Sequence, residues 1–373
     1  MSVRRQWSGI VAGVVLVLAA CQQPADQAPA APTVQPRTEA SAAVNAELRE
    51  LIEAAKQEGQ INLVWGSQYD AAAFADGFNR AYGLNVNVRY TPVPNFRSAA
   101  FQIVQEVQAG RTPSSDVVMA SPNLLLRMIE ADVVEAVDWS WAPNLKSPEL
   151  IAPKNAGVVV FHQMEGITYN SSLLTGDQVP RTMQDLLKPE FNGRLASTPQ
   201  AIGFGDLGSA DIWGEEKLFD YLARFSTQLA GLIQCGDDTR VASGEFAAFA
   251  IDCGQGATLR AKAQGQPLDY VVPSDTAKVW PGYLTMPRGA AHPNAARLWI
   301  NYMLSREAQD RLFELTYADT YLVPGAKTGR FIDDLKASGA AIHTVDLHWV
   351  MAQGENTARQ DKAAEILRAA GQR

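Results

Sequence analysis

The stretch SDVVMASPNLLLRMIEADVVEAV, residues 115–137, decides the fold class of this sequence. It opens with a Val-rich, strand-like run at 115–120, continues with a helical pattern over 122–131, and closes on a second short Val-rich run. Short strands that alternate with helical segments of about ten or more residues are typical of βαβ units and a mainly parallel sheet. The stretch therefore predicts an α/β fold.

The same alternation extends outward from this stretch in both directions. Upstream we expect one helix and then two strand–helix pairs, and downstream a second cycle after residues 157–170 and a helical tail. The expected strands are 61–66, 85–90, 193–198 and 268–272, with 278–287 crossing back; the expected helices are 45–58, 70–82, 96–109, 214–229, one that ends at Gly265, 293–304, 306–315 and 345–369.

The length of the folded part predicts two lobes. Residues 45–373 exceed the size at which one hydrophobic core stops growing, about 250–300 residues. The order of elements predicts that the chain builds one α/β lobe, crosses to a second near 166–170, and returns near 278–284. We therefore expect lobe 1 to contain 45–168 and 283–373, and lobe 2 to contain 169–282. Ligands of open α/β sheets bind beyond the carboxyl ends of strands, which directs attention to residues just after each strand.

The N-terminus is typical of an exported bacterial protein. Residues 1–20 combine two arginines with a short apolar run that ends in Leu18-Ala19-Ala20-Cys21, a pattern similar to the bacterial lipobox. We predict a signal peptide over 1–20 and lipidation of Cys21; the alternative is an ordinary cleaved signal that leaves Cys21 as a free thiol. Residues 21–44 are rich in Pro, Ala and Gln and predict a disordered tether.

Composition excludes several classes of function. The formal net charge is −8 and the chain has no basic stripe, which argues against nucleic-acid binding. No second apolar run reaches membrane-spanning length. Cys235 and Cys253 are an even pair in an exported chain and predict a disulfide, two separate buried thiols being the alternative.

The motifs for common enzymes and cofactors are weak or missing. GFGDLG, residues 203–208, has the spacing of a dinucleotide-binding loop, but it does not open the first βαβ unit, and a glycine-rich cleft loop is the better interpretation. The four histidines have no metal-ligand spacing, and neither a zinc-protease nor an α/β-hydrolase motif is present. We therefore expect no cofactor, no metal site and no enzymatic activity.

A family resemblance comes from the order of four segments. AAHPNAARLWINYMLSREAQDRLFE (290–314), the opening stretch 115–137, GITYNSSLL (166–174) and YLVPGAK (321–327) together resemble the extracellular solute-binding proteins of bacterial ABC importers, the group that includes the ferric-iron binders. The resemblance covers about 45–370. It implies a type 2 periplasmic-binding-protein fold with two crossing hinge segments, a small-molecule or ion ligand in the cleft between lobes, and an ABC permease as partner. With Cys21 it implies a monomer on the periplasmic side of the cell envelope, held to the membrane only by its lipid.

The resemblance breaks down at the positions of the iron ligands. Ferric binders of this group place two neighbouring tyrosines after the strand similar to residues 244–252, where this sequence has Asp252 and Cys253. They often place a carboxylate where this sequence has Ser121. Hard ferric iron prefers anionic oxygen ligands, so tyrosine-ligated iron is not expected.

The candidate ligand-binding residues follow predicted strands or lie at the crossings. Hydroxyl groups there can meet an anionic or polar ligand together with the N–H groups of a helix N-terminus, although plain helix capping uses the same residues. Aromatic rings there can hold an apolar or cationic ligand body, although burial in a core explains them equally well. The candidates are Ser67, Tyr69, Ser121, Asn123, Tyr169, Thr198, Phe204, Asp252 and Trp280.

Three other interpretations stay open at this point. One is a ferric-iron-binding member of the same group with ligands other than tyrosine, the second is an enzyme on a related two-lobed scaffold, and the third is a structural envelope lipoprotein whose cleft is filled. Iron, a phosphonate or phosphate, a polyamine and a small organic acid all remain as solutes.

Overall fold

The computed structural model describes residues 37–94, 96–353 and 357–371. The predicted signal peptide, Cys21 and the tether as far as residue 36 lie outside the described residues. Helix α1 (Arg37–Glu58) begins earlier than expected, so residues 37–44 are helical and do not belong to a coil. Pro36 is the last proline before a segment rich in Ala and Glu, which favour helix. Ala42–Arg373 form one compact unit, which contains both lobes.

Lobe 1 begins with the predicted strand–helix pairs. Strands β1 and β2 are parallel, and β3 lies beside β1 through a parallel bridge between Leu63 and Val117. The opening stretch forms β3 and α4 as predicted, but its last Val-rich run makes only one bridge, Val134 to Pro287. The elements are β1 (Gln60–Gly66), α2 (Ala75–Tyr82), β2 (Asn87–Val93), α3 (Phe96–Gln108), β3 (Val118–Ala120) and α4 (Pro122–Glu130).

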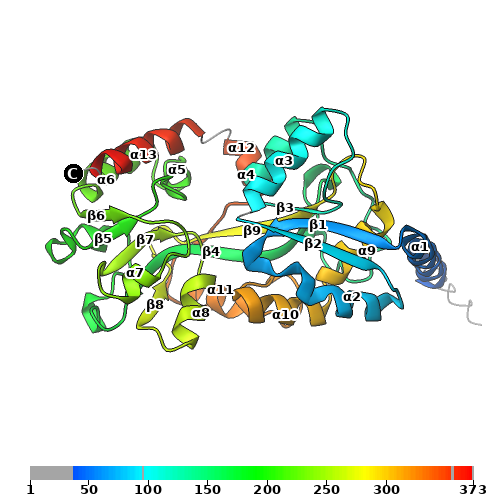
Figure 1. Cartoon of the computed structure of the whole chain (residues 1–373). Coiled ribbons are helices and arrows are strands. Elements are labelled where there is room, and N and C mark those ends of the chain that lie inside the picture. The colour runs from blue at the N-terminus through cyan, green and yellow to red at the C-terminus, as the bar shows by residue number, and fades with distance from the viewer. Residues whose placement is uncertain (1–36, 95, 354–356, 372–373) are drawn as a thin grey trace, which may run out of the picture. The chain divides into compact units, whose positions relative to one another are not determined.

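Two long strands carry the chain between the lobes, as predicted. β4 (Val158–Asn170) and β9 (Lys278–Thr285) are antiparallel and run through the middle of Figure 1. β4 pairs with β9 up to Glu165 and with β7 from Gly166 onward. The two parts of β4 thus join both lobes in one sheet of order β10-β9-β4-β7-β5-β6, with β3 on β9 and β8 on β4.

Lobe 2 repeats the α/β pattern with short elements. β5 is parallel to both β6 and β7, whereas β8 is antiparallel to β4. The elements are β5 (Leu195–Ser197), α5 (Phe204–Leu207), α6 (Glu215–Phe225), β6 (Leu229–Leu232), α7 (Thr239–Ala242), β7 (Ala248–Asp252), α8 (Gly256–Ala263) and β8 (Leu268–Val271).

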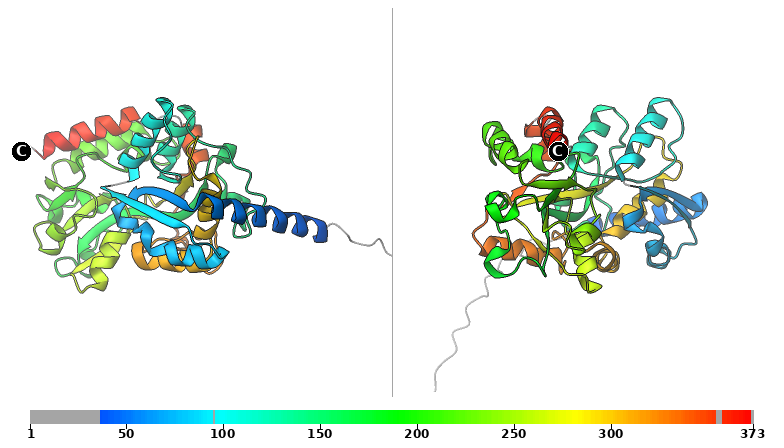
Figure 2. Two further views of the ribbon diagram at one scale, coloured as in Figure 1. Left: turned by 45° about the vertical axis from the view of Figure 1, so that its right-hand side comes forward. Right: turned by 60° about the vertical axis from the view of Figure 1, so that its left-hand side comes forward.

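The helices of the C-terminal segment pack against both lobes. α12 packs against α4 of lobe 1, whereas α13 packs against α5, α6 and β6 of lobe 2, where it is the red helix of Figures 1 and 2. The expectation that all of 283–373 belongs to lobe 1 is therefore wrong for α13, whose Ala363, Ala364 and Leu367 are part of the lobe 2 core. The elements are α9 (Pro293–Met303), α10 (Arg306–Thr316), α11 (Thr328–Ala337), β10 (His343–Thr344), α12 (Leu347–Gln353) and α13 (Thr357–Ala370).

Single-turn 3-10 helices fill several connections. At the start of one of them, η6, the side chains of Thr182 and Asp185 each accept a hydrogen bond from the other's backbone N–H, as in a capping box. Within the described residues, the 3-10 helices are η1 (Ser67–Tyr69), η2 (Ala71–Phe74), η3 (Pro148–Leu150), η4 (Pro153–Asn155), η5 (Gly176–Gln178), η6 (Gln184–Leu187) and η7 (Pro189–Phe191).

The segments that carried the family resemblance fasten lobe 1 together. Asp116 accepts hydrogen bonds from the backbone N–H of Asn62 at 2.7 Å and from that of His292 at 2.9 Å. Glu58 accepts from the first N–H groups of α9, at Asn294 and Ala295, so a carboxylate meets the positive end of the helix. These contacts hold α9 against β1.

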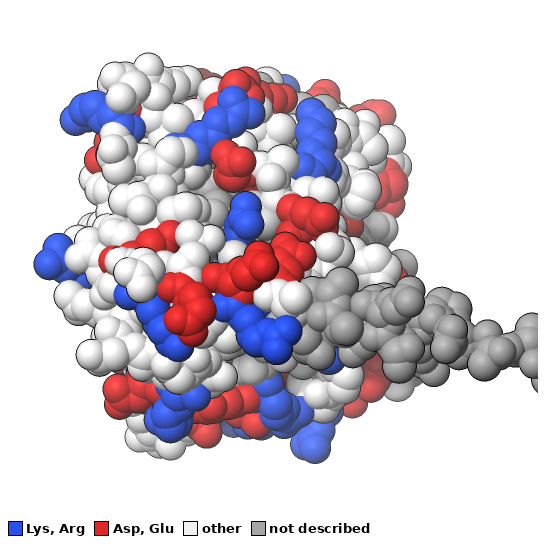
Figure 3. Space-filling view, turned by 90° about the vertical axis from the view of Figure 1, so that its right-hand side faces the viewer, with Lys and Arg blue, Asp and Glu red and all other residues white. Residues whose placement is uncertain are grey.

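The molecular surface is mixed in charge. Figure 3 shows acidic and basic side chains interspersed over the face that it draws. None of the described helices combines the length and the apolar character needed to cross a bilayer.

Candidate functional site

The candidate site lies at the carboxyl edge of the lobe 1 sheet. Leu63 of β1 is opposite Val117, the residue before β3, so Ser67 and Ser121 hold matching positions just beyond the two parallel strands. Ala120 is opposite Tyr283, which brings the start of β9 to the same edge. Register therefore gathers three of the strands from which the sequence analysis took its candidates.

An aromatic wall, defined as Tyr69, Phe96, Phe161 and Trp280, stands at this edge. The Tyr69 ring stacks on Phe161 with 5.4 Å between centroids, and Trp280 meets Phe161 edge-on at 5.7 Å. Phe96 meets Tyr69 at 6.4 Å. Tyr69 and Phe161 are buried, whereas Phe96 and Trp280 are half-buried and form the accessible ends of the wall.

Trp280 brings a free donor to the wall. Its indole N–H is shielded from solvent and has no acceptor among the described residues. A shielded donor of this kind usually has a partner, so a ligand or water is expected to supply the acceptor.

The absence of a side chain at Gly282 leaves room for the Phe161 ring of the wall. Gly282 pairs with Phe161 across β4 and β9, and a Cβ at position 282 would lie 2.0 Å from Phe161 Cζ. Because glycine has no side chain, the ring can lie over the neighbouring strand and reach both Tyr69 and Trp280. Phe161 was not among the predicted residues, since an apolar residue inside a long strand gives the same signal as a core residue.

Hydroxyl and amide groups flank the wall. Ser121 is the N-cap residue of α4, but its hydroxyl makes no capping hydrogen bond, and the side chain is half-buried. Asn123 is half-buried in the first turn of the same helix. Ser67 is exposed and is the first residue of η1, whose N-cap is Gly66. Ser121 and Ser67 thus leave side-chain oxygens for a ligand beside helix N–H groups.

The lobe 2 candidates do not form part of such a surface. Thr198 is fully buried, and its hydroxyl accepts a hydrogen bond from the Ile202 N–H, so it holds the turn after β5. Phe204 is fully buried and packs among Tyr221 and Phe225 in the lobe 2 core. Capping and core packing explain both side chains, and contact of either with a ligand stays a prediction.

Asp252 and Tyr169 also lie apart from the wall. Asp252 is only 1% exposed, and its carboxylate faces Thr168 and Thr258. Tyr169 is half-buried on β4 opposite Asp269; burial, and then the Asp269 carboxylate, raise the pKa of its hydroxyl. Of the nine predicted residues, the structure connects Tyr69 and Trp280 through Phe161 and places Ser67 and Ser121 at the same edge of the sheet.

A buried ion cluster, which the sequence analysis missed, lies where β4 passes between the lobes. Lys278 pairs with Glu165 across β4 and β9 and with Asp206 of α5 at 3.4 Å. Its ammonium also donates to the Gly203 carbonyl at 2.6 Å. The GFGDLG motif thus places the lobe 2 loop on a cation of the crossing strand.

The cluster is held by mutual charge neutralisation. Burial alone would lower the pKa of Lys278, but the carboxylates of Glu165 and Asp206 outweigh it and raise that pKa. Burial raises the pKa of Glu165, and the ammonium of Lys278 opposes the rise. A lysine in an otherwise apolar strand was the available sequence signal, but its partners come from segments far away in the chain.

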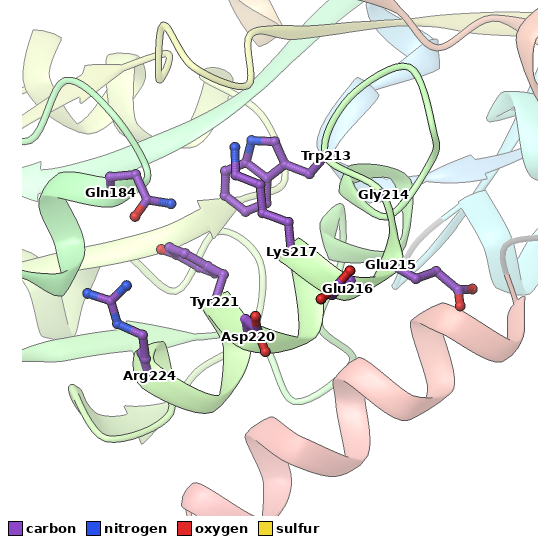
Figure 4. Close-up of a pocket in the computed structure, with 9 residues that line it drawn as sticks. All are labelled: Gln184, Trp213, Gly214, Glu215, Glu216, Lys217, Asp220, Tyr221 and Arg224. Atoms are coloured by element: carbon purple, nitrogen blue, oxygen red, sulfur yellow. The ribbon is translucent and has the colours of Figure 1, made fainter.

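Two surface cavities lie elsewhere. One, of about 550 Å³, is lined by the first turns of α6, where Figure 4 shows the Lys217 side chain alongside the Trp213 ring. Its Tyr221 hydroxyl already donates to the Met183 carbonyl. The other, of about 540 Å³, lies between α8 and α11 and includes Tyr270. The predicted ligand-binding residues do not line either cavity.

Residues 73–329 match the family described as bacterial extracellular solute-binding protein. The chain belongs to this family. Among curated relatives, it is 22% identical over 170 residues to the Fe(3+)-binding periplasmic protein of Serratia marcescens, covering 44% of this chain and 48% of the relative. It is 22% identical over 265 residues to the spermidine/putrescine-binding periplasmic protein 1 of Haemophilus influenzae, covering 66% of this chain and 71% of the relative. The chain spans about half or less of the first curated relatives it matches.

Solved structures show the same fold. The substrate-binding protein of an ABC transporter from Agrobacterium tumefaciens superposes with a TM-score of 0.69 at 17% identity, over 84% of this chain and 96% of that protein. The two-lobed periplasmic-binding-protein fold expected from the sequence is therefore confirmed, and the family and its structural neighbours are transport binding proteins. Within the described residues, no group of three or more His, Cys, Asp or Glu side chains is placed to hold a metal ion.

Proposed function

We propose that this protein captures a small organic solute at the carboxyl edge of the lobe 1 sheet and delivers it unchanged to an ABC permease. The observation that carries the proposal is the aromatic wall, whose half-buried rings of Phe96 and Trp280 lie at the same edge of the sheet as Ser121, whose hydroxyl makes no capping hydrogen bond. Lobe 2 would close over the bound solute. The solute would shift the equilibrium from the open to the closed state because it binds the closed state more tightly.

The wall favours a ligand with an apolar or cationic body and a polar head. Ring faces attract cations and apolar groups, and the Trp280 N–H requires an acceptor. The relatives named for iron and for polyamines mark the range of chemistry in the family, and of these the wall is better suited to an organic cation. Tyrosine-ligated ferric iron is not supported, because Asp252 and Cys253 stand where such binders carry tyrosines and Asp252 is buried.

We also infer the cellular setting from the N-terminus. The lipobox-like sequence ending at Cys21 supports a lipid anchor on the periplasmic side of the envelope. The protein would act as a monomer and without catalysing a reaction, like other solute binders. A structural lipoprotein is less well supported, because the chain belongs to a family of solute-binding proteins.

Thermal melting of the purified chain with a panel of solutes tests this proposal. The panel contains putrescine, spermidine, phosphate, a phosphonate, small carboxylates and ferric citrate. We expect one organic class to raise the melting temperature in proportion to log concentration, corresponding to about 2.7 kcal/mol at one hundred times Kd. The solute should be recovered unchanged. Stabilisation by ferric citrate alone with a visible tyrosinate band, or chemical conversion of the solute, would contradict the proposal.

A further inference from the structure

Two buried carboxyl groups of lobe 2 contact the same threonine, on two segments that a disulfide joins. Asp252 is the last residue of β7 and Asp238 immediately precedes α7; their exposed fractions are 1% and 5%. The Cys235–Cys253 bridge, with 5.7 Å between Cα atoms, joins the two segments that carry them. The disulfide therefore keeps two acids together in a place that water does not reach.

Two threonine hydroxyls connect the carboxyl groups. Thr168 Oγ1 of β4 lies 2.7 Å from Asp252 Oδ2 and 2.6 Å from Thr258 Oγ1 of α8. Thr258 Oγ1 lies 3.1 Å from Asp238 Oδ2. Both threonines are fully buried. The four side chains form one continuous chain of three hydrogen-bond contacts, from Asp238 to Asp252.

Counting protons along this chain shows that one is missing. Each contact needs one proton, and each hydroxyl supplies only one, while ionised carboxylates supply none. Thr258 also lies 3.3 Å from Asp252 Oδ2, but its single proton cannot serve that oxygen and the chain together. We propose that Asp238 and Asp252 share one additional proton in the folded protein, so that the pair carries a single negative charge.

The surroundings favour a shared proton over two charges. Among the described residues, neither carboxyl group forms an ion pair with Lys or Arg; Arg240 on α7 is paired with Glu245, and Lys262 on α8 with Asp269. Burial, followed by the charge of Asp238, raises the pKa of Asp252 to about 7.

The remaining neighbours add negative charge or are occupied. Burial is the main cause that raises the pKa of Asp238, and the negative charge of Asp237 in the same loop also raises it. Tyr270 of β8 faces both acids and Glu165, but its hydroxyl donates to the Met164 carbonyl. Glu165 is paired with Lys278. The third proton therefore has to come from the acid pair itself.

The shared proton predicts how stability depends on pH. The unfolded aspartates lose their protons near pH 4, whereas the folded pair keeps one up to about pH 7. The folded state thus binds one proton more than the unfolded state between these values, so its stability is greatest below the unfolded pKa and is lost as pH rises through the folded pKa. The unfolding constant should rise about tenfold per pH unit in this window.

The test compares Asp238→Asn with the wild type by urea unfolding across this pH window. The amide of the variant supplies the third proton permanently, so it should lack the tenfold-per-unit contribution and be at least as stable as wild type above about pH 7. Asp237→Asn, at the adjacent half-buried residue, is the control; loss of its charge should lower the upper end of the pH window but keep the wild-type slope within the window.

A second variant and infrared spectra provide two further tests of the shared proton. If Asp238→Asn does not fold, Asp252→Asn supplies the proton from the other end of the chain and should show the same flattened slope. Infrared spectra of wild type near neutral pH should contain a protonated-carboxyl band that is absent in either variant. Equal slopes in wild type and both variants, with no such band, would overturn the shared proton.

Discussion

Lys278 is a buried cation in a strand that is otherwise apolar. It is 2% exposed and neutralises Glu165 and Asp206, which come from a crossing strand and a lobe 2 helix. A buried ion pair is weak evidence for stability as such, but removing one partner leaves an uncompensated charge in a place without water. Lys278 therefore links helix α5 of lobe 2 to the crossing strands β4 and β9.

Replacing this lysine should be severe. We expect Lys278→Met to lower the free energy of unfolding by about 3–5 kcal/mol, because Glu165 would keep a buried carboxylate without its counterion. Lys262→Met, which removes the half-exposed pair with Asp269, is the matched control and should cost less than about 1 kcal/mol. Urea unfolding of both variants measures the difference; equal losses would show that the cluster has no special role.

At the scale of elements, β4 and β9 organise both the fold and the candidate site. The same pairing that leads the chain between lobes places Phe161 over Gly282 and next to Trp280. The connection after β7 is fastened separately, by the disulfide between Cys235 and Cys253 that the sequence predicted. Each lobe is thus stabilised by contacts that converge close to the crossing strands.

The disulfide should contribute measurably to stability. It closes a loop with a sequence separation of 18, for which the chain-entropy model gives about 3 kcal/mol. Reduction of the wild type should lower the midpoint of urea unfolding accordingly, whereas a variant with both cysteines changed to serine should not respond to reductant. An unchanged midpoint on reduction of the wild type would contradict this.

Local sequence patterns predicted where the helices and strands lie better than they predicted which other elements those helices and strands pack against. The strands and helices of the βαβ units carry their own periodicity, so β1, β3, α3, α4 and α9 followed from the sequence. An amphipathic helix shows that one face is buried but not against which lobe, and α13 was therefore misplaced. α11 was missed, since it carries only a few apolar residues and packs on a small cluster around Ile332.

The sequence likewise predicted only some of the residues of the candidate site. Ser67 and Ser121 followed from the rule that ligands meet strand ends, and Tyr69 and Trp280 from their places beside those ends. Phe161 and Lys278 were not predictable, because their roles depend on which strand lies next to β4. For Thr198 the sequence could not separate the two roles, because a capping hydroxyl and a ligand-binding hydroxyl have the same sequence context.

At the scale of the whole molecule, the protein is a two-lobed member of the solute-binding family, and we propose that a lipid tethers it to the envelope. Cys21→Ser should release the protein into the soluble exported fraction, because lipidation of that residue is the proposed anchor. Cell fractionation with an antibody to the folded part measures the distribution. Retention of the variant in the membrane fraction would show that another part of the chain or a partner holds it there.

The central claim is that a small solute binds at the aromatic wall, and native mass spectrometry of the freshly purified chain tests it most directly. We predict a bound solute of defined mass in the wild type, its loss in Trp280→Ala, and its retention in Trp213→Ala, a control at the cavity on α6. Melting curves should confirm that both variants are folded. A solute that survives Trp280→Ala but is lost in Trp213→Ala would contradict the claim and place the site on lobe 2.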